Sequence, residues 1–219
     1  MVQSDGMESN WAVEHLQVIR TLMERSAVYR RALAPIMTFN GVLGLVAAGA
    51  GWGMKLGASR SFLIFWACVC AVAMAGSFLL ARRQALKDSE PFWSPPTRRV
   101  TQAFLPPFMA GAVITVIAWF NLDTVPNHLD VVLAMWWLPL SWVVLYGCAI
   151  HSAGFMMPRG MRIFGWAFVL CGSGLFAVGI PDWTSPMNCG YGVMGFFFGG
   201  LHLAAGIYLY FTEKRGNEP

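Results

Sequence analysis

His202 is the residue whose side chain could most readily do chemistry, because it lies inside a long apolar run near the C-terminus. An imidazole ring can share hydrogen bonds, exchange a proton near neutral pH or bind a metal. Three interpretations follow: a neutral ring hydrogen-bonded across a helix seam, a group lining a proton or small-molecule path, or a ligand of haem or a metal. The interpretation as a haem or metal ligand requires His151 as the second imidazole, although His151 lies in another apolar run and at a different expected depth in the membrane.

Few other polar groups lie within the apolar runs. The candidates share a hydrogen-bonding side chain inside such a run, and they are Ser173, Ser141, Tyr146, His151 and Asn40. Polar groups in a bilayer usually face a partner or a cavity, so together with His202 they form a candidate intramembrane polar site. The two serines are expected at the depth of His202, and the other three closer to one membrane surface.

Catalytic patterns are missing from the sequence. No Asp or Glu lies within an apolar run, and no serine has the Gly-x-Ser-x-Gly surroundings of a hydrolase nucleophile. No cluster of Cys and His has the spacing of a metal site. We therefore predict no enzymatic activity, no bound cofactor and no metal site.

Glycines at helical spacing predict where His202 points. With His202 itself, the glycines of the last run recur every three or four residues and form one stripe: Gly192, Gly195, Gly199 and Gly206. Small residues let helices approach closely in lipid, so the ring is expected in a packed seam. The preceding run has glycines seven residues apart on one face: Gly165, Gly172 and Gly179. We expect these two glycine faces to pack against each other.

The composition is that of an integral membrane protein. Apolar residues make up 57% of the 219-residue chain and charged residues 12%, about half the charge of a soluble domain. Six apolar runs approach the roughly 20 residues that cross a bilayer; they are 36–56, 62–81, 100–120, 131–151, 163–180 and 190–211. The predicted fold is all-α and polytopic, with six transmembrane helices in three hairpins that form one bundle over 36–211.

The basic residues predict the orientation. If the six runs cross the membrane, all 15 Lys and Arg residues except Lys55 and Arg60 fall in segments on the same side of it. Cytoplasmic loops typically carry such an excess of Lys and Arg. Both termini, 1–35 and 212–219, are therefore expected in the cytoplasm. Anionic lipid headgroups account for the net charge of +4 without a nucleic-acid partner.

Two segments on that side could contact a partner. Apolar residues recur at helical spacing over 11–32, which predicts a cytoplasmic amphipathic helix before the first span. The segment 82–99 is basic, and its prolines interrupt a continuous helix. The helix could lie on headgroups or under the bundle, or with 82–99 it could dock a cytosolic protein or a second copy. A homo-oligomer is allowed by the small residues but is not required by them.

Four segments resemble a family of small six-span bacterial membrane proteins without an assigned activity. They are IRTLMERSAVYR (19–30), FLPPFMAGAVIT (104–115), LPLSWVVLYGC (138–148) and GFFFGGLHLAAGIY (195–208). Some members are encoded beside winged-helix transcription regulators. The resemblance implies a bacterial inner-membrane protein and favours a protein partner, and it implies no catalytic residue.

We rank three functions on this basis. The first is a non-enzymatic membrane protein that senses or tethers a cytosolic partner through 11–32 and 82–99. The second is a small-solute transporter or channel subunit built around the His202 seam. The third is a haem- or metal-binding electron-transfer subunit that uses His151 and His202.

Overall fold

The computed structural model describes residues 32–87, 89, 91–125 and 129–215, and the predicted helix over 11–32 lies almost entirely outside them. Within these ranges all regular structure is helical, and six helices are long and apolar enough to cross a membrane. The chain is thus an all-α protein with six candidate membrane spans. Each described span overlaps one of the six apolar runs of the sequence.

Four spans are uninterrupted α-helices over the residues that the structure describes. The first span covers Ala32–Gly53, and the next are α2 (Ser59–Lys87), α3 (Pro95–Asn121) and α6 (Arg159–Val178). α3 starts at the proline pair within the 82–99 segment, because proline is favoured in the first turn of a helix, and the helix continues through Pro106 and Pro107 in its interior. α6 ends at Gly179, whose φ of 75° suits a residue without a Cβ.

The fourth and sixth spans each change helix type within their length. The fourth runs through α4 (Leu129–Val132), the π-helical η1 (Leu133–Trp137), α5 (Leu138–Ala153) and the 3₁₀ turn η2 (Gly154–Met156). The sixth runs through α7 (Pro186–Met194), the π-helical η3 (Gly195–Leu201) and α8 (His202–Arg215). Pro139 is the second residue after η1 and lacks a backbone donor, while η3 contains three glycines. Such π segments often mark functional positions.

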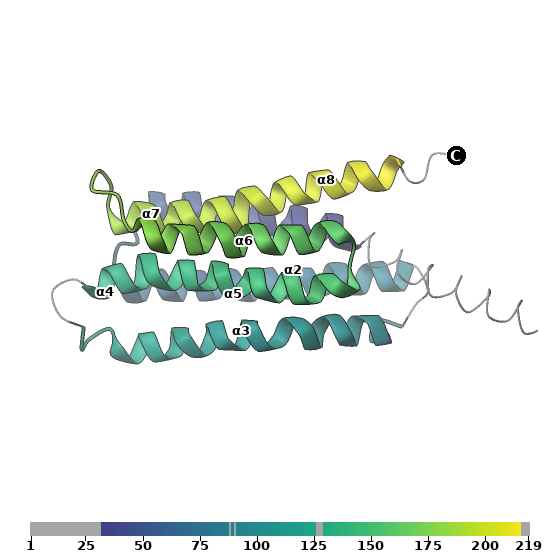
Figure 1. Ribbon diagram of the computed structural model, residues 1–219, viewed down its shortest axis with the longest axis horizontal. Coiled ribbons are helices and arrows are strands. Elements are labelled where there is room, and N and C mark those ends of the chain that lie inside the picture. The colour runs from purple at the N-terminus through teal and green to yellow at the C-terminus, as the bar shows by residue number, and fades with distance from the viewer. Residues whose placement is uncertain (1–31, 88, 90, 126–128, 216–219) are drawn as a thin grey trace, which may run out of the picture.

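The helices run roughly parallel to one long axis, and α3, α5 and α6 are neighbours along the bundle (Figure 1). We call the end with Lys87, Arg98 and Arg99 the basic end, and the end with Asp123 and Asp182 the acidic end. Large apolar side chains on the outer faces, such as Val113 and Ile117 of α3, are more than half exposed in the isolated chain. Lipid is the solvent that suits such a surface.

Glycines bring the first span and the last span into direct backbone contact. A Cβ on Gly44 would lie 2.4 Å from the carbonyl oxygen of Phe198, and one on Gly41 would lie 2.4 Å from the backbone nitrogen of Leu203. From the other side, a Cβ on Gly206 would lie 2.4 Å from the hydroxyl of Thr38. Only glycine permits such a close approach, because a Cβ would overlap these atoms. In lipid, close packing of this kind replaces the hydrophobic force that holds helices together in water.

The two glycine faces predicted to pack on each other have different partners. Gly165 lies against the backbone of Gly147 and His151 in α5, and Gly172 lies against valines of α5. The glycines of the last span at 195, 199 and 206 lie instead against the first span. The fifth and sixth spans meet through aromatic rings such as Phe168 and Phe197, whose bulk keeps the two backbones apart.

Gly179 and Gly192 do not act as packing residues in the way that the sequence predicts. A Cβ on either would meet no atom within 4 Å. Gly179 ends α6, and Gly192 lines a hollow on the surface of the bundle. The regular spacing puts these residues on a common face but does not determine whether another helix covers that face.

Two glycines of the first span allow a matched test of this seam. Gly44→Ala should lower the free energy of unfolding by about 1–3 kcal/mol, because the new methyl group meets backbone atoms of the last span. Gly49→Ala places the same group in open space and should be neutral or stabilise by up to about 1 kcal/mol through helix propensity. Thermal unfolding in detergent measures both, and equal melting temperatures for the two variants would contradict the close contact.

Candidate functional site

His202 lies in the packed interior at the point where η3 gives way to α8. Its side chain is 1% exposed. Four aromatic rings surround the imidazole, with centroids between 5.3 and 5.9 Å from its own; they belong to Tyr146 of α5, Phe164 and Phe168 of α6, and Phe198 of η3. Side chains of three spans therefore enclose the ring.

Both nitrogens of the His202 ring have hydrogen-bond partners. Nδ1 lies 2.9 Å from the carbonyl oxygen of Phe197, and Nε2 lies 2.7 Å from the hydroxyl of Tyr146. A carbonyl oxygen only accepts, so Nδ1 carries the proton. In a neutral ring, Nε2 then has a lone pair, and the Tyr146 hydroxyl donates to it. The two contacts together select one tautomer of a neutral imidazole.

The bond to Phe197 ties the side chain of His202 to the π segment of its own span. The acceptor carbonyl lies five residues earlier, inside η3, and the backbone N–H of His202 donates to Gly199 in the same segment. The imidazole thus adds a donor at the end of the π segment, where the hydrogen-bond pattern of the helix changes. Tyr146 adds a tie between this segment and α5.

The other candidates are not brought to His202. The Ser141 hydroxyl donates to the Trp137 carbonyl of its own span, and Ser173 is exposed on α6. The amide of Asn40 donates to the Ser77 hydroxyl, which links the first span to α2.

His151 lies apart from His202 and near the basic end. Its Nδ1 is 3.4 Å from the carbonyl of Arg162, and its ring contacts those of Phe155 and Trp166. Of the six predicted polar residues, only Tyr146 and His202 form one site.

The geometry leaves His202 little freedom to act as a ligand. A metal or haem iron at Nε2 would have to displace the Tyr146 hydroxyl, and His151 is engaged elsewhere. Within the described ranges, no three His, Cys, Asp or Glu side chains are grouped in a way that could hold a metal. The arrangement is suited to holding spans together through a satisfied polar pair in a low-dielectric interior.

The aromatic enclosure of His202 was not predicted from the sequence. Phe164 and Phe168 are four residues apart and therefore share a helix face, which is a usable signal. That this face meets His202 depends on how α6 sits beside the last span. Two further buried groups also went unnoticed: the indole N–H groups of Trp66 and Trp136 have no hydrogen-bond partner among the described residues.

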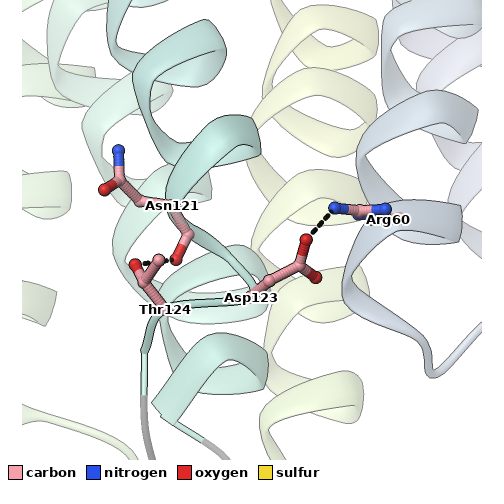
Figure 2. Close-up of polar contacts among 4 residues, drawn as sticks. All are labelled: Arg60, Asn121, Asp123 and Thr124. Carbon is pink, nitrogen blue, oxygen red and sulfur yellow. Dashed lines mark hydrogen bonds and ion pairs between the residues drawn. The ribbon is translucent and has the colours of Figure 1, made fainter.

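Polar contacts also join the helices at the acidic end. Figure 2 shows the Arg60 guanidinium directed at the Asp123 carboxylate, 2.5 Å apart, while the Thr124 hydroxyl donates to the Asn121 carbonyl. Arg60 also lies over the Trp119 ring, 5.3 Å from its centroid. The start of α2 is thereby tied to the end of α3. Both charged partners are at least half exposed, so this pair contributes little to stability.

A second pair of contacts at the same end joins other spans. The largely buried Ser59 donates to Asp130 at the start of the fourth span, over 2.8 Å. The Trp52 indole donates to the Asn188 side chain, which links the first span to the last. These contacts order the acidic end without forming a cluster of titratable groups suited to catalysis.

Comparison with known proteins gives no match to a protein family, a curated protein or a solved structure.

Tyr146→Phe tests the polar pair. It removes the donor to Nε2 while keeping the ring, so it should lower the free energy of unfolding by about 1–3 kcal/mol. Ser173→Ala, at an exposed position, should change it by less than about 0.5 kcal/mol. Nitrogen NMR of histidine-labelled protein should find His202 protonated at Nδ1 and unprotonated at Nε2. The opposite tautomer, or no effect of Tyr146→Phe on unfolding, would contradict the assignment.

Proposed function

We propose that this chain is a non-catalytic bacterial inner-membrane protein, with both termini in the cytoplasm, that tethers a cytosolic protein at its basic end. The observation that carries the proposal is the length of α2 together with its exposed basic end. Arg82, Arg83 and Lys87 are all exposed on the last turns of this helix. The segment 82–99, predicted from the sequence as a docking element, belongs to the same end, whereas the other predicted element, 11–32, lies outside the described residues except for Ala32.

The length of α2 supports a part outside the membrane. Its 29 residues give a helix of about 44 Å, whereas the hydrocarbon core is about 30 Å thick. In Figure 1 the ends of α2 and α8 extend beyond the connection between α5 and α6. α2 therefore reaches beyond the α5–α6 connection at this end (Figure 1).

The chemistry of the projecting part is that of a protein contact surface. Leu86 is 71% exposed and Trp93 is 60% exposed, and both lie close in sequence to exposed arginines. The ring of Phe92 packs on Phe78 of α2, with centroids 5.0 Å apart, which holds the segment after α2 against the helix. Tryptophan and arginine are the residues that most often dominate protein interfaces.

The distribution of charge supports the orientation. Arg98, Arg99 and Arg162 lie near the basic end with the three basic residues of α2, whereas Asp123, Asp130 and Asp182 lie at the other end. Short basic loops stay in the cytoplasm. We infer that the basic end faces the cytoplasm and the acidic end faces the outside.

The interior gives less support to the other two functions. A transport path through His202 would need space beside the ring, but the ring is 1% exposed and enclosed by aromatic groups. An electron-transfer subunit would need free imidazole nitrogens, and both nitrogens of His202 are engaged. A closed core with an exposed, chemically mixed end favours the tether.

Reporter fusions test the orientation. Green fluorescent protein fused after Pro219 should fluoresce in the bacterial host, and alkaline phosphatase fused at the same position should be inactive, because neither would be exported. Fusions truncated after Val125, at the acidic end, should give the reverse result. An active phosphatase after Pro219 would invert the topology and remove the cytosolic partner from the proposal.

A photo-crosslinking residue in place of Leu86 tests the docking surface. The control carries the same residue in place of Trp183, which is 86% exposed at the opposite end. In living cells, position 86 should give a discrete protein adduct and position 183 should not. When the variant with the crosslinker at position 86 also carries Arg82→Glu and Arg83→Glu, the adduct should disappear while the amount of this chain in the membrane stays the same. The reason is that charges at the rim of an interface steer association. Only lipid adducts, or an adduct indifferent to charge reversal, would contradict the tether.

A further inference from the structure

A surface hollow lies between α6 and the last span, in the half of the bundle nearer the acidic end. It has a volume of about 430 Å³ and is lined by Cys171, Gly174, Leu175, Gly192, Val193, Phe196 and Phe197. Cys171 is the only side chain in this lining that is not a hydrocarbon, an aromatic ring or a glycine hydrogen. The hollow is open to the outside of the bundle, because Gly174, Gly192 and Phe196 are exposed.

Missing side chains on both helices create this space. A Cβ on Gly174 or on Gly192 would meet no atom within 4 Å. Larger side chains at these two positions would extend into the gap that Leu175, Val193 and Phe197 leave between the backbones. In water such a gap would tend to close, but in lipid no hydrophobic force draws the two helices together.

We propose that this hollow holds one acyl chain of a phospholipid from the leaflet at the acidic end. The hollow lies within two membrane spans and opens on their lipid side, so hydrocarbon is what reaches it. An empty hollow would leave its lining without dispersion contacts. Water would find almost no hydrogen-bonding partner there. This inference is independent of the tether function proposed above.

The rim of the hollow favours a flexible chain over a helix from a second copy. Val178, one turn beyond Gly174 on the same helix, is 74% exposed, and Phe196 and Leu170 are 57% and 63% exposed. These projecting side chains would hold a neighbouring helix away from the glycines on the floor. A hydrocarbon chain can pass between them and follow the surface.

The inner wall of the hollow is also part of the histidine site. Phe197 is one of the residues that line the hollow, and its carbonyl accepts the Nδ1 hydrogen bond of His202. A bound chain would therefore lie against the π segment that His202 closes. The site thus has one wall formed in part by Phe196 and Phe197 of η3 and a floor that includes two glycines.

Photolabelling with a lipid tests the proposal. The full chain is reconstituted in phosphatidylcholine vesicles that contain a phosphatidylcholine with a diazirine on its acyl chain, and labelled residues are mapped by mass spectrometry. We expect the label to be enriched on Cys171 and Phe196 over Val113 and Ile117 of α3, which are ordinary exposed positions. The double substitution Gly174→Leu with Gly192→Leu should reduce labelling of the hollow to the α3 level.

Matched variants keep the outcome clear. Gly49→Leu adds the same side chain at an open position of the first span and should leave labelling of the hollow unchanged. The filled variant should unfold at the wild-type temperature or above, since its new side chains replace lipid and improve helix propensity. Equal labelling of the hollow and α3 in the wild type would mean ordinary surrounding lipid only and would overturn the proposal. In a variant whose single cysteine is Cys171, a disulfide crosslink between two chains would assign the hollow to a second copy. That result would also overturn the proposal.

Discussion

The bundle depends on the close contact between the first and the last span. These two helices are the farthest apart in the chain, and yet Gly41 and Gly44 lie against the backbone of Leu203 and Phe198. In a bilayer, close packing has to replace the hydrophobic force that assembles soluble proteins, and glycine is the residue that allows it. With the last span held in this way, its other side presents His202 and Phe197 to the rings of α5 and α6.

Hydrogen bonds between side chains reinforce this packing at several depths. His202 joins Tyr146, Asn40 joins Ser77, and the Trp142 indole donates to Thr115, over 2.7 to 3.0 Å. Each pair connects two different spans. A polar side chain in a low-dielectric interior needs a hydrogen-bond partner, and here a neighbouring span supplies it. The residues of these three pairs therefore act as ties between helices, and His202 is the most enclosed of them.

The two ends of the molecule differ in character. At the acidic end, polar contacts such as Ser59 with Asp130 and Trp52 with Asn188 link helices to one another. At the basic end, α2 carries exposed basic and apolar side chains beyond the length that a bilayer needs. The proposed tether depends on this difference between the two ends.

Much of the architecture could be read from the sequence because a bilayer imposes strict lengths. Six apolar runs predict six spans, and the described helices overlap all of them. The start of α3 at Pro95 also follows from local chemistry, since proline is favoured in the first turn of a helix, whereas the continuation of α2 to Lys87, beyond the predicted run 62–81, was not predicted. The spacing of glycines did not identify their partners: Gly165 and Gly172 meet α5, the last span meets the first, and His202 lies on the other side of the last span from the glycines that make this contact.

What the amino-acid sequence determined by itself was the class of protein, the number of spans and the residues able to form an intramembrane polar site. Each of these depends on hydropathy or residue type along one segment. Only the tertiary structure decided that Tyr146, out of five candidates, reaches His202, and that three phenylalanine rings close around it. The reason is physical: the rotation and register of each helix depend on all its neighbours at once, and the π segments shift that register within a span.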